Sequence, residues 1–177
     1  MELGLFKDEV KIVPYEEGWK SEFLKVKKDL MEHVNLKAKQ IEHIGSTSIK
    51  GILAKPVIDI MVGVNRLNTL DKNFFKNLQR IGFYRLQIER PHEIVCAKFT
   101  EHSFEMKTHF IHIVEYGNEK WQQMLFFRDY LNAHEDAKQQ YQALKSNFFS
   151  TDLAGINAYT KYKEQFIQSI FEKKEEY

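Results

Sequence analysis

A glycine followed by three hydroxyl residues is the most distinctive chemical feature of the sequence. Gly45, Ser46, Thr47 and Ser48 come directly after AKQIEHI, a stretch that is typical of a strand. The backbone N–H groups and hydroxyls of such a segment can surround a phosphate group. The same residues also suit an ordinary turn, in which Ser46 or Ser48 caps the next helix. The segment is therefore a candidate phosphate-binding loop.

An aspartate inside an apolar strand is the second chemical signal. Asp59 interrupts VIDIMVGV and, because strand side chains alternate, shares a face with Met61 while the isoleucines share the other. A carboxylate in such a strand is costly to bury unless it binds a cation or accepts hydrogen bonds. Asp59 is thus a candidate metal ligand or general base. The alternative is a structural aspartate tied to a neighbouring lysine such as Lys55.

A histidine in a later predicted strand, FEMKTHFIHIV, can join this site. His112 alternates with His109 along that strand, and we expect His112 to point into the same cleft as Asp59. There it would serve as a metal ligand or as a general base, because the ordinary pKa of histidine lies near neutrality. His43 and His109 are further candidate ligands, but a lone histidine in a strand is more often a hydrogen-bonded structural group. No tight ligand spacing such as H-x-x-x-H is present.

Two cations and one helical face complete the candidate site. Lys55, between the Gly-Ser segment and Asp59, can reach a phosphate as a point charge. Arg128 offers a fork of donors to a triphosphate, or else takes part in structural ion pairs. Tyr141 and Lys145 stand four residues apart on a predicted helix and so share a face. They either line the cleft opposite Asp59 or belong to the core and surface of the helices.

The elements that must position these residues follow an α+β order. Periodic apolar residues predict a first helix, a shorter one that ends at Gly82, and a helical C-terminal third. Alternating or β-branched stretches predict strands before and between these helices, and VKIVPY near the start is the first of them. The expected fold is a mixed β-sheet flanked by helices. The helices are expected at about residues 16–34, 67–81, 118–149 and 155–172.

Composition limits the classes of function. The 177 residues suit one domain, 1–177, and a net charge of +1 gives no general attraction to nucleic acid or to an anionic membrane. The single cysteine, Cys96, excludes an internal disulfide framework and suits a reducing compartment. The start, MELGLFKDEV, lacks the pattern of a signal peptide, and no apolar run is long enough to span a bilayer. We therefore expect a cytoplasmic protein.

The spacing of the two main signals resembles a known superfamily. A strand, Gly-Ser, twelve intervening residues and an aspartate on an apolar strand resemble nucleotidyltransferases of the polymerase-β type. More closely, EHIGSTSIKGILAKPVIDIMV is similar to the GrpB family of bacterial proteins. The segments VPYEEGWKSEF, IHIV and LFFRDYLNAHEDAKQQYQALK extend this likeness over nearly the whole chain.

The resemblance implies a function and one departure from it. Active transferases of that fold carry Asp-x-Asp or Asp-x-Glu on the strand, binding two metal ions beside the nucleotide phosphates, whereas this chain has Met61 at the second position. The expected activity is binding of a nucleotide or other phosphorylated small molecule, with or without nucleotidyl or phosphoryl transfer. The expected cofactor is a divalent metal (Mg²⁺, Mn²⁺ or Zn²⁺); Asp59 with His112 suits one Zn²⁺- or Mn²⁺-like ion, or none. The alternatives are a catalytically silent binding module and a protein-interaction or folding-accessory domain.

Overall fold

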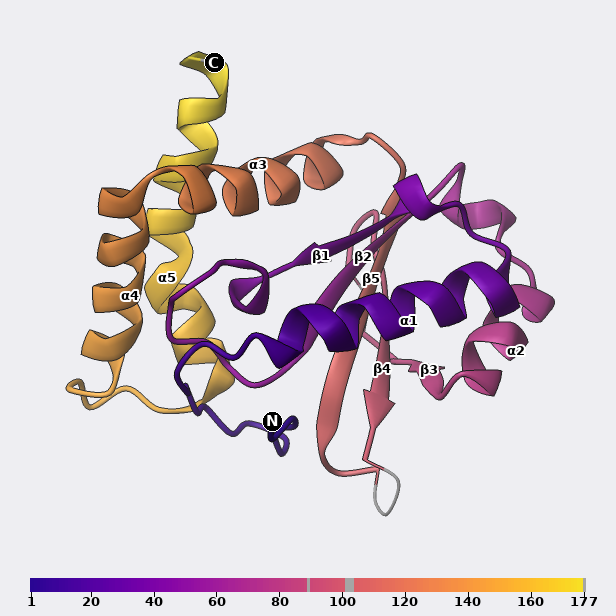
Figure 1. Cartoon of the computed structure of the whole chain (residues 1–177), viewed down its shortest axis with the longest axis horizontal. Helices are drawn as coiled ribbons and strands as arrows, with labels where there is room; N and C mark the ends of the chain where they lie inside the picture. Colours follow the sequence, from indigo (N-terminus) through magenta and orange to yellow (C-terminus); the bar gives the residue numbers. More distant parts are fainter. Residues whose placement is uncertain (89, 101–103, 177) are drawn as a thin grey trace.

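The computed structural model describes residues 1–88, 90–100 and 104–176 (Figure 1). Within these residues the helices are α1 (Gly18–Val34), α2 (Lys72–Arg80), α3 (Glu119–Ala133), α4 (Glu135–Phe148) and α5 (Gly155–Glu172). The strands are β1 (Ile41–Ile44), β2 (Ile58–Val64), β3 (Phe83–Arg85), β4 (Ile94–Phe99) and β5 (Lys107–Glu115). The predicted α+β class and helical C-terminal third are confirmed. None of the helices described combines the length and the hydropathy that a membrane span requires.

The central pair of the sheet sets the orientation of the candidate site. The strand order is β1-β2-β5-β4-β3, with β2 and β5 parallel and the other neighbours antiparallel. In this register Asp59 lies opposite Phe110, and Met61 lies opposite His112. Residues paired across strands point to the same face of a sheet. The pairing therefore puts Asp59 and His112 on one face.

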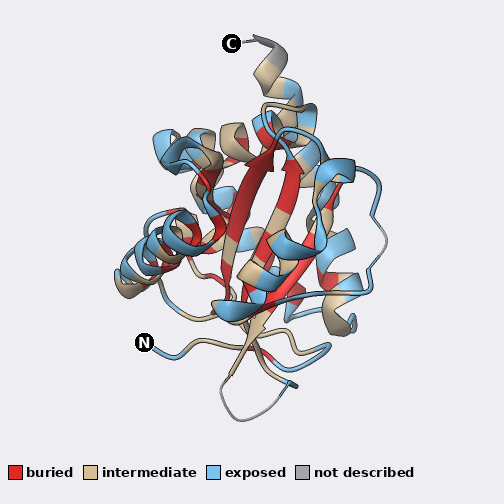
Figure 2. Cartoon of the chain, turned by 90° about the vertical axis from the view of Figure 1, so that its right-hand side faces the viewer, coloured by how far each residue is buried: buried red, intermediate tan, exposed pale blue. Residues whose placement is uncertain are grey.

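The opposite face of the sheet is the main hydrophobic core. Ile58 and Ile60 of β2 are fully buried there against Trp19 and Leu30 of α1, all 0% exposed. Figure 2 shows the strands as a buried band, with the outer surfaces of the helices exposed. Burial of each such large side chain contributes about 1.5–3 kcal/mol, so this layer fixes the position of β2.

Helix α3 covers only one end of the face that carries Asp59. Trp121 of α3 packs on Met61 and Val114, and Gly63 permits this approach because a Cβ there would lie 2.9 Å from the Trp121 ring. Beyond the sheet, α4 and α5 stand side by side and pack on α3 around Phe127 (Figure 1). The remainder of this face is left open toward α5.

Two sequence predictions about local structure were inaccurate. VKIVPY does not form a strand of the sheet; Val13 makes an isolated bridge with Ala54. The helix predicted at 67–81 begins later, at Lys72, because the Asp71 side chain accepts a hydrogen bond from the Phe74 N–H and caps it.

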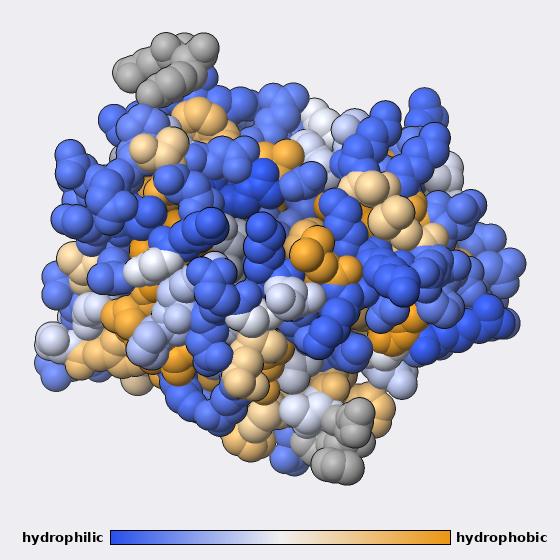
Figure 3. All heavy atoms as spheres, viewed as in Figure 1, coloured by the Kyte–Doolittle hydropathy of each residue, from blue (hydrophilic) through white to orange (hydrophobic). Residues whose placement is uncertain are grey.

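Figure 3 shows that the face carrying α1 is mainly hydrophilic, with apolar side chains in scattered groups.

Candidate functional site

A cleft of about 900 Å³ lies between the open face of the sheet and α5. Its floor includes Asp59 and His112, and Lys55 stands at its edge. The segment 5–9 near the N-terminus forms another wall, which the sequence did not indicate. The apolar residues of the cleft come from the N-terminal segment, the residue before β2, the strands β4 and β5, the segment after β3, and α5: Leu5, Phe6, Val57, Val95, Phe110, Leu86, Ile88, Ile156, Ile167 and Phe171. Further charged residues line it as well: Lys7, Asp8, Glu9, Arg90, Lys107, Lys161 and Glu164. We call the part around Asp59, His112 and Lys55 the charged end, and the part lined by the apolar residues of the sheet and α5 the apolar arm.

The backbone of Gly45 closely approaches the Asp59 side chain. β1 pairs with β2 so that Ile44 lies opposite Asp59, and Gly45 leaves the strand with φ +70°. A Cβ at Gly45 would lie 3.0 Å from the Asp59 Cβ and would overlap its Oδ2. Only glycine allows both this backbone conformation and this approach. The Asp59 side chain keeps 28% exposure, so a ligand in the cleft can reach it.

His112 lies between two carboxylates. Its Nδ1 is 2.6 Å from Glu93 Oε1, and its Nε2 is 3.5 Å from Asp59 Oδ1. Burial lowers the pKa of His112, but the hydrogen bonds with Asp59 and Glu93 outweigh it and hold the pKa above its ordinary value. Burial likewise opposes ionisation of Asp59, yet the His112 contact and the charge of Lys55 keep its pKa below the ordinary range.

Glu93 is the functional candidate that sequence reasoning missed. It precedes β4, its side chain is 0% exposed, and its Oε2 accepts hydrogen bonds from Lys120 Nζ (2.5 Å) and Arg90 (3.3 Å). Burial raises the pKa of Glu93, but the hydrogen bonds from His112 and Lys120 lower it to about 2. The only sequence signal was a carboxylate at the start of an apolar strand, whereas Asp59 stands out because it interrupts one.

Two lysines and a tyrosine lie together next to this end of the cleft. Lys163 Nζ lies 4.1 Å from the centre of the Tyr159 ring, and Lys55 Nζ lies 5.9 Å from the same ring. Burial lowers the pKa of Lys55 and brings that of Lys163 to about 8, while the charge of Asp59 raises both. The two ammonium groups are thus partly desolvated near the Asp59 carboxylate. Lys163, four residues after Tyr159, was not among the predicted residues.

Tyr141 and Lys145 of α4 do not line the cleft; they contact the loop between β1 and β2. Lys145 is fully buried; its Nζ donates to the Leu53 carbonyl and lies 4.5 Å from the centre of the Tyr141 ring. The Tyr141 hydroxyl lies 3.5 Å from Ser46 Oγ. Burial lowers the pKa of Lys145 to about 7. These contacts tie α4 to the Gly-Ser segment and its continuation.

The hydroxyls of the predicted phosphate loop have different surroundings. Ser46 faces Tyr141, whereas the Ser48 hydroxyl donates to the Gly45 carbonyl at 2.6 Å and closes the turn. Thr47 is buried, and its hydroxyl donates to the Val57 carbonyl. Ser46 is therefore the hydroxyl best placed to turn toward a ligand, and Thr47 and Ser48 shape the loop.

Arg128 is engaged in ion pairs outside the cleft. Its NH1 lies 2.7 Å from Glu42 Oε2 and donates to the His43 carbonyl at 3.0 Å, and its Nε lies 2.7 Å from Asp129. Arg128 was predicted to neutralise phosphate, but in the structure its side chain joins α3 to β1. This arrangement matches the structural alternative for that residue.

The other two strand histidines lie on the far face of the sheet. His43 stacks on Phe23 of α1, with ring centres 4.9 Å apart, and His109 lies 3.5 Å from Glu22 of the same helix. Burial lowers the pKa of each to about 4, so both are neutral at physiological pH. They are core histidines, separated from Asp59 by the thickness of the sheet.

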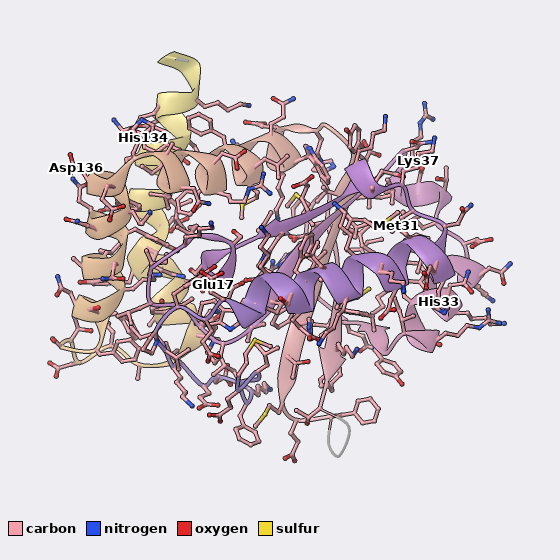
Figure 4. All side chains as sticks on the ribbon, in the orientation of Figure 1. Glu17, Met31, His33, Lys37, His134 and Asp136 are labelled. Atoms are coloured by element: carbon pink, nitrogen blue, oxygen red, sulfur yellow. The ribbon has the colours of Figure 1, made fainter. Side chains whose placement is uncertain are left out.

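Asp59 and His112 offer one oxygen and one nitrogen ligand atom, 3.5 Å apart, but no second carboxylate for a two-metal clamp. Met61, where the second carboxylate would stand, is 0% exposed and packs against Ile44 and Val114. Elsewhere among the described residues, three possible ligands lie close enough together to share one ion: Asp29, Glu32 and His33. This group lies at the exposed end of α1, across the molecule from the α3–α4 junction marked by His134 (Figure 4).

The lowered pKa of Lys145 predicts that the free energy of unfolding rises with pH above 7. Its pKa is about 7 in the folded chain and 10.5 in its unperturbed state, so between these values the unfolded chain binds the extra proton. The free energy of unfolding of the wild type, relative to Lys145→Met, should rise by about 2 kcal/mol from pH 7 to pH 9. Parallel denaturant titrations of the two proteins measure this difference. A constant difference over that range would show that Lys145 does not lose its proton there.

Comparisons with known proteins identify relatives of this chain. A family model described as GrpB protein matches residues 9–173. Glutamate-rich protein GrpB of Alkalihalophilus pseudofirmus is 40% identical over 169 residues, which cover 95% of this chain and 97% of that protein. The crystal structure of conserved protein GrpB from Enterococcus faecalis superposes with a TM-score of 0.78 at 26% identity, over 92% of this chain and 96% of that one.

A likeness in fold extends to nucleotidyltransferases. The Cid1 poly(U) polymerase, in a structure with MgGTP bound, superposes with a TM-score of 0.53 at 15% identity, over 76% of this chain and 43% of that one. At this identity the match shows a common fold, and the predicted nucleotidyltransferase-like architecture is confirmed. Together with the match over 9–173, these findings show that the chain belongs to the GrpB family.

Proposed function

We propose that this protein binds the phosphate groups of a nucleotide at the charged end of the cleft. The observation that carries the proposal is the gathering of Lys55 and Lys163 beside Asp59, where Gly45 brings its backbone against the carboxylate. Lysine binds phosphate as a point charge, and partly desolvated ammonium groups gain most from an anion. A polyphosphate would add negative charge beside the two lysines, beyond that of Asp59.

The apolar arm supports a nucleoside rather than inorganic phosphate as the rest of the ligand. The volume of the whole cleft, about 900 Å³, lies in the range of small-molecule sites, which run from about 300 to 1,000 Å³. Phe110 and Val95 from the sheet face Ile167 and Phe171 from α5 across it. Such walls suit the flat faces of a base, while polar side chains on α5, Asn157 and Gln168, can contact its edges.

Group transfer is a second, narrower proposal. In-line displacement with two metals needs carboxylates that hold both ions, and the buried thioether of Met61 cannot replace one. This favours nucleotide binding without two-metal catalysis, as in a silent binding module. Transfer with one ion would use Asp59 to hold the cation and the lysines to neutralise the phosphates.

Isothermal titration calorimetry with ATP, GTP, CTP and UTP, each with and without Mg²⁺ or Mn²⁺, tests the proposal. We expect micromolar binding of at least one nucleotide, weakened at least about tenfold in Lys55→Met and in Lys163→Met. Lys28→Met, an exposed lysine on α1 at the opposite face, is the matched control and should bind like the wild type. The proposal fails if the folded protein binds none of these nucleotides, or if all three variants bind equally well.

The pH dependence of binding follows from Lys163. Because its pKa is about 8 in the free protein, an anion that binds beside it must draw a proton onto it at higher pH. We expect nucleotide affinity to fall by about tenfold between pH 7 and pH 9, with proton uptake at pH 8. Calorimetry in two buffers of different ionisation enthalpy measures the uptake. Equal heats in the two buffers would mean that Lys163 does not change its protonation on binding.

A further inference from the structure

We infer that Asp59 and His112 together hold one divalent cation through an oxygen and a nitrogen ligand, a site that favours Zn²⁺ and Mn²⁺ over Mg²⁺. Glu93 acts as the positioning residue of this site. The inference deepens the proposed function, since phosphate oxygens of the nucleotide would supply further ligands. This site cannot use a pair of carboxylates, because Met61 occupies the position on the strand where the second carboxylate would stand.

The geometry of the two ligand atoms supports a shared ion. His112 Nε2 and Asp59 Oδ1 are 3.5 Å apart, and both side chains line the cleft, with 17% and 28% exposure. Two ligand atoms at about 2.1 Å from one ion lie about 3.4 Å apart when the angle between them is tetrahedral. The observed separation is therefore close to the spacing of neighbouring ligands of one ion.

Glu93 determines which ring nitrogen of His112 is available. A carboxylate can only accept, so the 2.6 Å contact places the proton on Nδ1 and leaves Nε2 toward Asp59 and the cleft. Glu93 is itself fixed, with a fully buried side chain held by Lys120 and Arg90. A carboxylate that orients a metal-binding histidine in this way is a common outer-sphere arrangement, and its loss costs about 10- to 100-fold in metal affinity.

The donor set predicts the selectivity. Mg²⁺ prefers oxygen ligands in octahedral geometry, whereas imidazole suits Zn²⁺ and other transition metals. With two protein ligands, the ion must take water or phosphate oxygens at its other positions. We therefore expect moderate affinity for the free ion, tighter binding when a nucleotide is present, and the order Zn²⁺, Mn²⁺, Mg²⁺ from strongest to weakest.

The test is a titration of the intact protein with MnCl₂, in which binding is monitored as the loss of the free Mn²⁺ signal in electron paramagnetic resonance. His33→Asn serves as the parent, because it disables the surface group Asp29, Glu32 and His33 that could bind Mn²⁺ independently. In this parent we expect one Mn²⁺ site, displaced by ZnCl₂ at lower concentration than by MgCl₂. Asp59→Asn and His112→Gln should each weaken it at least tenfold, and Glu93→Gln about tenfold, whereas the exposed Glu119→Gln should not change it.

A second readout does not depend on whether the variants fold. In the wild-type protein, ¹⁵N spectra of the histidine rings should show a large shift of His112 Nε2 on addition of ZnCl₂, and little change for the buried rings of His43 and His109. The inference is overturned if His112 Nε2 does not respond, if His112→Gln binds Mn²⁺ as well as its parent, or if Mg²⁺ displaces Mn²⁺ as readily as Zn²⁺ does.

The experiment also separates this inference from the proposed function. Nucleotide titrations in EDTA measure binding by the lysines alone. Nucleotide binding without any Mn²⁺ site would overturn the metal site and leave the proposed function standing. A Mn²⁺ site that needs His112, in a protein that binds no nucleotide, would support the metal site and contradict the proposed function.

Discussion

Gly45→Ala is expected to abolish nucleotide binding and to lower the free energy of unfolding by about 2–4 kcal/mol. Gly45 has φ +70°, a conformation that costs an alanine about 1–2 kcal/mol. The added Cβ would also overlap Asp59 Oδ2, so either the loop or the carboxylate must move. Both lie at the charged end of the cleft, and a shift of either removes the geometry that phosphate binding requires.

Gly51→Ala is a close control for that substitution. Gly51 lies in the same loop with φ +79°, but a Cβ there would meet no heavy atom within 4 Å. It should therefore cost only the backbone term, about 1–2 kcal/mol, and leave nucleotide binding intact. Calorimetry and denaturant unfolding of both variants measure the two effects. Equal loss of binding in the two variants would show that contact with Asp59 is not the reason for the glycine at position 45.

Glu93→Gln is expected to lower the free energy of unfolding by about 2–3 kcal/mol at neutral pH. The substitution keeps the size of a side chain that is 0% exposed but removes the charge that faces His112, Lys120 and Arg90. The loss is smaller than for a fully buried ion pair because Lys120 and Arg90, at 38% and 47% exposure, regain contact with water.

Glu119→Gln, on the exposed start of α3, is the control for Glu93→Gln and should change the free energy of unfolding by less than about 0.5 kcal/mol. Chemical unfolding of both variants beside the wild type gives the comparison. If Glu93→Gln is as stable as the control, then the buried carboxylate contributes nothing to the fold, and its contact with His112 loses its structural importance.

Local patterns in the sequence were sufficient to predict the main elements of the fold. The apolar period of α1 and the β-branched run of β2 each determine one element, and alternation along β2 and β5 puts Asp59 and His112 on one face once the strands pair in register. Lys55 is carried toward Asp59 by its position four residues before it. These features depend on neighbours in sequence, which a single chain displays.

Contacts between distant segments could not be predicted in this way. Arg128 pairs with Glu42, 86 residues away, and Glu93 meets Lys120 from another element, 27 residues on. Lys163 belongs to a helix whose position over the sheet depends on the packing of α3 on α4 and α5. The segment at residues 5–9 becomes a wall of the cleft only because Leu5 forms a bridge with Lys107 of β5.

The most direct test of the account is the location of a bound nucleotide. We would record ¹H–¹⁵N NMR spectra of the wild-type protein during titration with ATP in the presence of Mn²⁺-free MgCl₂, after assignment of the backbone. Phosphate binding beside Asp59 should give the largest shifts at Lys55 and Asp59, which line the cleft, and at their neighbours Gly45, Ser46 and Lys163. Absence of shifts at saturating ATP, or shifts confined to the surface of α1, would contradict it.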